Sequence, residues 1–274
     1  MIHVDTLIEK ALSEDIGDGD VTTSAIMTTP QILTAHLLAQ EPLVVAGIDV
    51  VCRVYAQLDP MLQVTKYCED GEEVGTGDTI AVLTGEAAPL LQGERVALNF
   101  LQRLSGVATI TRAFVGRVKD YPVKILDTRK TTPGWRALEK YAVQVGGGEN
   151  HRLGLFDAVL IKDNHISAAG SIGEAVKRVR AHLGEDFPVE VETKNLREVK
   201  EALASGVNTI MLDNMSTEMM REAVTMIKGK ALVEASGGVT LDTVEEIART
   251  GVDCISVGAL THSARAVDIS LKFV

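Results

Sequence analysis

Residues 189–213 of this chain read VEVETKNLREVKEALASGVNTIMLD. The two ends of the stretch, 189–193 and 209–213, are short runs rich in β-branched residues, and the residues between them place apolar side chains at helical spacing. A strand, a helix and a second strand in this order predict a parallel βαβ unit. A polar side chain, Glu192 or Asp213, lies at or near the carboxyl end of each predicted strand.

The same unit recurs through the second half of the chain. Counted from Glu192, it repeats about every 21 residues, through Asp213 and Glu234 to Ile255. A constant unit with polar residues at the carboxyl ends of the strands is typical of an α/β barrel. We predict strands at 123–127, 158–162, 189–193, 209–213, 231–235 and 254–257, and helices at 171–183, 196–204, 217–227 and 241–248. These strands are too few for a complete eight-stranded barrel.

The first hundred residues have a different pattern. Strand-like runs at 31–46 and 61–83 contain turn-forming residues, which predicts antiparallel pairing. A long helix is predicted at 89–118, and we expect Gly106 to kink or divide it. The predicted organisation is therefore an N-terminal α/β domain over 1–106, an α/β barrel over 107–266, and a C-terminal segment, 267–274, that returns to the N-terminal domain.

The composition is that of a globular α/β protein with an acidic surface. Hydrophobic residues make up 46% of the chain and aromatic residues only 4%. The formal charge of −11 argues against nucleic acid or an anionic membrane as the main partner. No apolar run is long enough for a membrane span, and the N-terminus has the pattern of an amphipathic helix rather than a signal peptide. Three widely spaced cysteines, Cys52, Cys68 and Cys254, favour reduced thiols in a cytoplasmic protein.

One segment of this acidic chain is basic. From Lys124 to Lys162 there are seven Lys or Arg and one His against four carboxylates, an excess of three positive charges when His is neutral. Gly-rich sequence at 146–148 lies within the segment. Concentrated cations in an otherwise acidic protein indicate a local site for a small, highly charged anion.

The candidate cations follow predicted strands. Thr128, Arg129 and Lys130 begin the loop after the strand at 123–127, and barrel enzymes place their sites on such loops. A solvated basic turn is the alternative for this loop taken alone. That alternative weakens because His151 with Arg152, and then Lys162, follow at the neighbouring strand.

Carboxylates and small residues follow the later strands. Glu190 and Glu192 share one face of their strand, and we expect the deeper Glu190 to pair with a buried cation such as Lys124. Glu192 and Asp213 could accept bonds from sugar hydroxyls or hold hydrated Mg²⁺, although Asp213 could instead cap a helix. Small residues that could admit a phosphate close the last two strands, at Ser236, Gly237 and Gly238 and at Val257, Gly258 and Ala259.

These motifs, in this order over nearly the whole chain, resemble those of the quinolinate phosphoribosyltransferases, a type II phosphoribosyltransferase family. The resemblance is carried by residues 14–23, 94–99, 104–109, 127–130, 150–152, 161–165, 190–192 and 212–214. It implies an N-terminal α/β sandwich, an open α/β barrel of about seven strands, and a homodimer or higher assembly. It also implies phosphoribosyl transfer from phosphoribosyl pyrophosphate to quinolinate, with Mg²⁺ and loss of CO₂, giving nicotinate mononucleotide and pyrophosphate for NAD biosynthesis.

The resemblance also implies roles for single residues. Lys130, Lys162, Glu192 and Asp213 would be catalytic, and Glu192 and Asp213 would hold the metal, most simply through water. The carboxylates of quinolinate would be bound by Arg129, His151, Arg152 and Lys162, together with Arg95 of the partner subunit. Lys130 would contact pyrophosphate, Thr128 lies in the same loop, and the 236–238 and 257–259 loops would bind a phosphate.

Two other readings are compatible with parts of the sequence. One is a related type II protein, either an enzyme that uses nicotinate or the relative associated with molybdate transport. An enzyme that uses nicotinate would need fewer cations, because nicotinate has one carboxylate. A carrier or scaffold protein would use the hairpin-rich segment at 71–85. That segment has no lysine at its tip for attaching a prosthetic group, so the enzyme reading is favoured.

Overall fold

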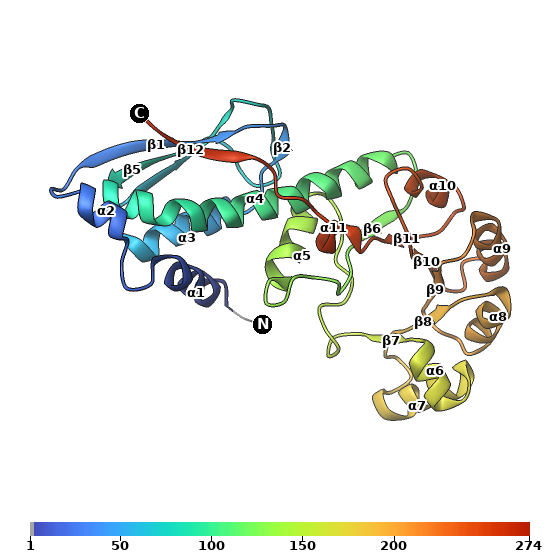
Figure 1. Cartoon of the computed structure of the whole chain (residues 1–274). Helices are drawn as coiled ribbons and strands as arrows, with labels where there is room; N and C mark the ends of the chain where they lie inside the picture. Colours follow the sequence, from blue (N-terminus) through green and yellow to red (C-terminus); the bar gives the residue numbers. More distant parts are fainter. Residues whose placement is uncertain (1–2) are drawn as a thin grey trace. The chain divides into compact units, whose positions relative to one another are not determined.

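The computed structural model describes residues 3–274, which divide into two compact units (Figure 1). The first unit comprises the chain up to Arg112, then Thr131–Gly147 and Ser263–Val274. The second comprises Ala113–Lys130 and Gly148–His262. The sequence analysis assigned 131–147 to the barrel domain, whereas in the structure this segment packs within the first unit.

The first unit contains an antiparallel sheet with the strand order β12-β1-β5-β3. Alternate residues of β1, namely Ala35, Leu37 and Ala39, are buried, as expected for a strand with one face on the core. Leu37 pairs with Leu271 of the C-terminal strand, which is how the end of the chain joins this sheet. The strands are β1 (Ile32–Ala39), β3 (Gln63–Lys66), β5 (Thr79–Glu86) and β12 (Ile269–Phe273), and a separate pair is formed by β2 (Leu43–Val44) and β4 (Glu73–Val74).

Helices accompany this sheet, and the longest of them corrects one prediction. The helix α4 (Ala87–Arg117) runs without interruption through Gly106, so Gly106 does not divide it. A Cβ atom at Gly106 would lie 2.0 Å from the carbonyl oxygen of Arg265, so glycine permits close packing of the returning chain. The other helices of the unit are α1 (Val4–Ile16), α2 (Val21–Ile26), α3 (Ile48–Leu58) and α5 (Arg136–Val145).

The second unit is built on a parallel sheet with the strand order β6-β11-β10-β9-β8-β7. Leu126 forms a further parallel bridge with Glu149, which adds a rudimentary seventh strand beside β6. The predicted open α/β barrel is thereby confirmed. The strands are β6 (Lys124–Leu126), β7 (Val159–Ile161), β8 (Val189–Thr193), β9 (Thr209–Asp213), β10 (Leu232–Ser236) and β11 (Cys254–Ser256).

Helices cover the outer face of this sheet (Figure 1). Leu212, Ala235 and Ile255 are fully buried on that face, at matching heights of adjacent strands. The residues between them point to the opposite face, which lines the barrel interior. The helices are α6 (Asp163–Ala169), α7 (Ile172–Leu183), α8 (Leu196–Ala204), α9 (Thr217–Ile227), α10 (Val244–Ala248) and α11 (Ala259–His262).

Candidate active site

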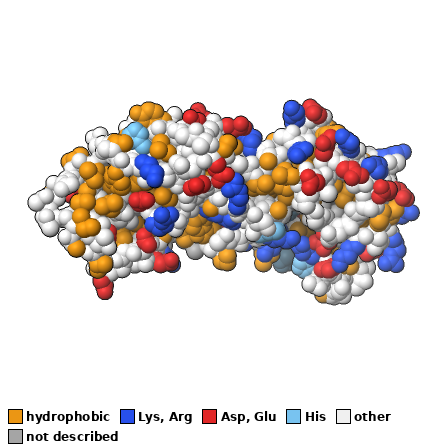
Figure 2. All heavy atoms as spheres, turned by 45° about the horizontal axis from the view of Figure 1, so that its top comes forward, with side chains coloured by type: hydrophobic (Ala, Val, Ile, Leu, Met, Phe, Trp, Pro, Cys, Tyr) orange, Lys and Arg blue, Asp and Glu red, His pale blue; other side chains and the backbone are white. Residues whose placement is uncertain are grey.

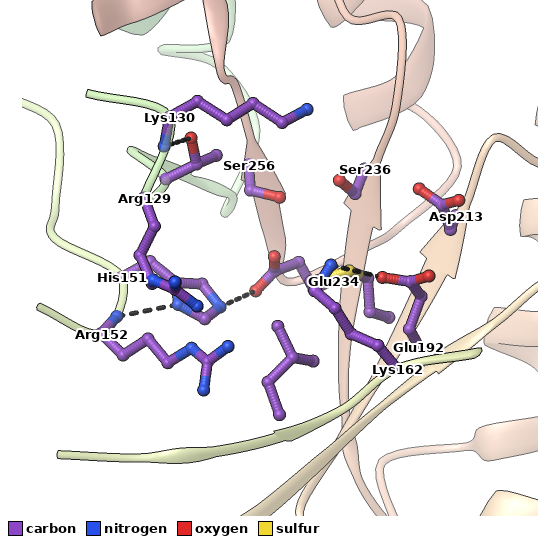
Figure 3. Close-up of a pocket in the computed structure, with 13 residues that line it drawn as sticks. Arg129, Lys130, His151, Arg152, Lys162, Glu192, Asp213, Glu234, Ser236 and Ser256 are labelled. Carbon is purple, nitrogen blue, oxygen red and sulfur yellow. Dashed lines mark hydrogen bonds and ion pairs between the residues drawn. The ribbon is translucent and has the colours of Figure 1, made fainter. Parts of the chain in front are cut away.

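A cavity of about 340 Å³ opens at the carboxyl ends of the barrel strands. Every strand of the parallel sheet contributes to it because the residues that point inward near the strand ends, and those just beyond them, converge there. Its lining residues are Thr128, Arg129, Lys130, His151, Arg152, Leu160, Lys162, Glu192, Met211, Asp213, Glu234, Ser236 and Ser256 (Figure 3). All of them belong to the second unit.

The loop after β6 brings Arg129 and Lys130 to one side of the cavity (Figure 3). The backbone N–H of Lys130 donates to Thr128 Oγ1 at 3.1 Å, and Thr261 Oγ1 donates to the Lys130 carbonyl at 2.8 Å. A Cβ atom at Gly258 would lie 3.0 Å from the Lys130 side chain. Hydrogen bonds therefore fix the backbone of Lys130 through both its N–H and its carbonyl group, and Gly258 leaves space for its side chain.

Arg152 lies on the same side of the cavity as Arg129. Its Nη1 donates to the Ala158 carbonyl at 3.1 Å. Burial, and then the nearby charge of Arg129, lower the pKa of Arg152, because both effects disfavour a second cation there. Two guanidinium groups gathered in one cavity are suited to a ligand with carboxylates.

Lys162 lies on the other side, immediately before helix α6. Its Nζ is 2.7 Å from Glu192 Oε2, and the Glu192 side chain is only 9% exposed. Asp213, at the end of the adjacent strand, accepts from Asn214 Nδ2 at 2.9 Å. It does not cap α9, because Ser216 does so by accepting from the Met219 N–H. The alternative role of Asp213 as a helix cap is therefore wrong.

His151 and Glu234, which line the cavity, form a largely buried cluster with Glu190. His151 Nε2 lies 3.0 Å from Glu190 Oε2 and 3.6 Å from Glu234 Oε2. The predicted partner of Glu190 was wrong, since Lys124 instead pairs with Glu149 at 3.0 Å. Glu190 pairs with His151 because the segment that carries His151 lies across the barrel at this point. The depth of Glu190 on its strand does not predict this partner.

Burial, and then the neighbouring Glu190 carboxylate, raise the pKa of Glu234 to about 7. Opposing contributions come from His151, Ser256 and Lys162. Glu234 is only 2% exposed. A carboxyl group in this position holds its proton more tightly than one in water.

The backbone also positions His151. The buried carboxylate of Asp127, at the end of β6, accepts from the His151 N–H at 2.9 Å. The Nδ1 atom of His151 accepts from the Arg152 N–H at 2.8 Å. Because Nδ1 is an acceptor, the ring carries its proton on Nε2 and donates toward Glu190.

The structure brings most of the predicted site residues together, but not all. Arg95 lies on the first unit, is exposed, and makes no ion pair with any residue among 3–274. The N–H of Val257 already donates to the Leu126 carbonyl at 2.9 Å, so it is not available to bind an anion. The predicted residues that do not line the cavity are Arg95, Gly237, Gly238, Val257, Gly258 and Ala259.

The sequence analysis did not assign a role to four residues of the lining. Glu234 lies two positions before Ser236 on β10, so period-two alternation places both on the inner face. Its signal was a carboxylate inside an otherwise apolar strand. Ser256 could have been found in the same way, whereas Leu160 and Met211 look like ordinary core residues in the sequence.

Of the seven Lys and Arg between Lys124 and Lys162, the four that line the cavity are Arg129, Lys130, Arg152 and Lys162. Acidic and basic side chains are interspersed over the face of the molecule shown in Figure 2, without one broad charged patch. No helix in the described part of the chain is both long enough and apolar enough to cross a membrane.

Comparisons with known proteins agree across the chain. Residues 20–105 match the family model described as quinolinate phosphoribosyl transferase, N-terminal domain, and residues 107–272 match that of the C-terminal domain.

Curated relatives cover nearly the whole chain. A quinolinate phosphoribosyltransferase [decarboxylating] of Nicotiana glauca is 47% identical over 97% of this chain and 81% of its own length. A probable nicotinate-nucleotide pyrophosphorylase [carboxylating] of Bacillus subtilis is 44% identical over 98% of this chain and 93% of its own. Among solved structures, NadC from Streptococcus pyogenes superposes with a TM-score of 0.95 at 42% identity, covering 99% of this chain and 97% of that one.

Proposed function

This chain belongs to the quinolinate phosphoribosyltransferase family, and we propose that it transfers the phosphoribosyl group of phosphoribosyl pyrophosphate to quinolinate. The products are nicotinate mononucleotide, pyrophosphate and CO₂, and the reaction serves NAD biosynthesis. One observation carries the proposal in this chain. Arg129, Lys130, Arg152 and Lys162 gather in one cavity of a protein whose formal charge is −11.

The cavity offers quinolinate a matching environment. Arg129 and Arg152 would pair with its carboxylates, because a guanidinium group can bind a carboxylate through two parallel hydrogen bonds. Leu160 and Met211 provide apolar surface for the pyridine ring. Lys162 would exchange part of its contact with Glu192 for the substrate. His151 directs its Nε2–H to Glu190, so its contribution is to the shape of the site more than to its charge.

The phosphoribosyl donor would occupy the rest of the cavity. Lys130 would contact the pyrophosphate, and Glu192 and Asp213 would accept bonds from the ribose hydroxyls. Ser236, with the Gly237–Gly238 and Gly258–Ala259 loops, would approach the 5′-phosphate. Both glycines at 237 and 238 have positive φ, so this turn exposes its backbone in a way that other residues rarely adopt.

The residues present also fit a magnesium ion. Glu192 and Asp213 offer carboxylate oxygens from adjacent strands, and Mg²⁺ prefers oxygen ligands while keeping several of its waters. When bound, the ion would offset negative charge on the departing pyrophosphate.

The chemistry calls for alignment more than for a protein nucleophile. Loss of pyrophosphate leaves a ribose with oxocarbenium character, and Lys130 would stabilise the charge of the leaving group. The pyridine nitrogen then attacks the anomeric carbon, so the cations that fix quinolinate also fix the line of attack. Once this nitrogen is quaternary, the adjacent carboxylate can leave as CO₂.

We further propose a homodimer in which Arg95 of the partner subunit completes the site. Its support is that Arg95 is exposed and has no ion-pair partner among residues 3–274, although the residues that follow it on α4, Val96, Ala97 and Leu98, are buried. We also place the protein in the cytoplasm. The three cysteines remain free thiols, as expected in a reducing compartment.

Paired assays with two acceptors test the proposed function. The protein is incubated with phosphoribosyl pyrophosphate, Mg²⁺ and either quinolinate or nicotinate, and pyrophosphate is measured. We expect quinolinate to support turnover and nicotinate to be poor, because nicotinate has only one carboxylate for the two guanidinium groups. Equal or better turnover with nicotinate would show that the enzyme is the nicotinate-using relative.

A further inference from the structure

A second cavity, of about 480 Å³, lies beneath the first within the same barrel. It is lined by residues from the opposite ends of the strands, including Lys124, Thr209 and Cys254. Three residues, His151, Arg152 and Glu234, line both cavities. The cluster of His151, Glu190 and Glu234 therefore lies where the two cavities meet.

The cluster combines two carboxyl groups with one neutral imidazole. One possible ligand atom from each residue can be chosen so that all three lie within 4.8 Å of one another. A metal ion does not suit these atoms, because His151 accepts a backbone N–H at Nδ1 and so carries its proton on Nε2. Two carboxylates this close in a buried site are stable only if they share a proton.

The geometry decides which of the two holds the proton. The nearer Glu190 oxygen, at 3.0 Å, accepts the single N–H of His151, which stabilises its ionised form. Glu234 is more deeply buried, and its Oε1 has no hydrogen-bond partner among the described residues. Glu234 is thus a carboxylic acid that lines both cavities and has one buried oxygen that no described group binds.

Its position is between the two groups of cations that would hold quinolinate. Figure 3 shows the Glu234 carboxyl group between His151, beside Arg129 and Arg152, and Lys162 on the other side. A pyridine ring held by these cations would have its carboxylate-bearing edge over Glu234. We propose that Glu234 is the general acid that protonates C2 of the pyridine ring after CO₂ has left, an inference that rests on the proposed function.

The bond from C2 to its carboxylate breaks, CO₂ departs, and the electron pair stays on C2 beside the quaternary nitrogen. C2 takes the proton of Glu234, which becomes a carboxylate. One proton from solvent restores the acid before the next turnover, and the second cavity gives water a path to the cluster from the other side of Glu234.

The charged and titratable groups around Glu234 come from several elements. Glu190 on β8 disfavours its carboxylate, whereas His151 and Lys162 favour it. On β11, burial and then Glu234 itself raise the pKa of the Cys254 thiol, so this group is neutral. Burial and Glu190 dominate, and they hold its pKa near 7. The acid form is therefore lost as pH rises above about 7.

The variant Glu234→Gln tests the proposal because it keeps the shape of the side chain but has no acid proton. In a single turnover, pyrophosphate is measured together with CO₂ from quinolinate labelled in its 2-carboxylate. We expect pyrophosphate release at nearly the wild-type rate and net CO₂ release slower by about 100-fold or more. Quinolinate mononucleotide should accumulate, because CO₂ still in the cavity adds back to C2 when no acid protonates this carbon. Pyrophosphate and CO₂ slowed equally, or neither slowed, would overturn the proposal.

Two controls separate this role from others. Glu190→Gln keeps the acid but removes one cause of its raised pKa, so pyrophosphate and CO₂ should stay coupled at about pH 6 and separate at a lower pH than in the wild-type protein. The wild-type protein needs no mutation, and its CO₂ release should lag behind pyrophosphate as pH rises from about 6 to about 8.5; unchanged coupling over that range also contradicts the proposal. If the wild-type protein releases no pyrophosphate from quinolinate at any pH, the proposed function itself fails.

Discussion

Replacing Arg152 with methionine should lower kcat/KM for quinolinate while leaving the stability of the fold almost unchanged. Arg152 is partly buried, and its guanidinium group lies near that of Arg129, whose charge disfavours it. Removing its charge relieves that repulsion, so the fold should lose little more than the hydrogen bond to the Ala158 carbonyl. Methionine retains much of the apolar volume of the arginine stem.

The substitution should instead weaken the interaction of the enzyme with quinolinate. A hydrogen bond to a charged group contributes about 1.5–3 kcal/mol, and a guanidinium group can make two with one carboxylate. Because Arg129 remains to compensate in part, we take a net loss of about 2–4 kcal/mol. That corresponds to a decrease in kcat/KM for quinolinate of about 30- to 700-fold.

Initial rates measured over a range of quinolinate concentrations, with phosphoribosyl pyrophosphate saturating, give this ratio. Thermal unfolding of the same sample gives the change in stability. Lys119→Met is the matched control, since it removes one positive charge from an exposed position in the same unit that does not line the cavity. A decrease of less than about threefold for Arg152→Met, or an equal decrease for the control, would refute the assignment of Arg152.

Three further outcomes are expected. Lys162→Ala should reduce turnover by about 100-fold or more while the protein remains folded, because Lys162 is 46% exposed and contributes little to the core; near-normal activity in a folded variant would contradict its role. Arg95→Ala and Lys162→Ala proteins, each inactive alone, should regain activity when mixed, and no recovery despite confirmed subunit exchange would count against a site shared between subunits. Glu139→Ala should lower the free energy of unfolding by about 3–5 kcal/mol in urea titrations, because this fully buried carboxylate accepts from Arg103 and Thr132; a loss below about 1 kcal/mol would show that the buried pair is not required.

The regular elements of the barrel could be predicted closely. The strands at 189–193 and 209–213 and the helices at 196–204 and 217–227 have the bounds that the periodicity predicts. Each of these helices begins after a polar N-cap residue, Asn195 or Ser216, so its first residue can be predicted from the sequence. Local signals decide these elements, so the sequence is sufficient for them.

Packing between segments far apart in the chain could not be predicted as well from the sequence. The role of Gly106 depends on a chain segment about 160 residues away, which passes close to the helix at Arg265. A glycine that permits close packing and one that ends a helix look alike in a sequence. The assignment of 131–147 to the first unit likewise depends on contacts that no local pattern records.

The candidate site also has one part that the sequence predicts and another that depends on the folded structure. The cations at 129, 130 and 162 follow strands and could be found from the predicted strand ends, whereas Arg152 lies between α5 and β7. The pairing of His151 with Glu190 and Glu234 could not, because it depends on how the 149–152 segment lies across the barrel. The inward face of Glu234 follows from alternation, but its burial and its raised pKa follow only from the assembled structure.

A crystal structure with quinolinate bound is the most direct test of whether the barrel cavity is the acceptor site. We predict that the carboxylates lie within about 3 Å of the guanidinium groups of Arg129 and Arg152, with the ring over Leu160 and Met211. Quinolinate bound outside this cavity, or inside it with both carboxylates turned away from these arginines, would contradict the assignment.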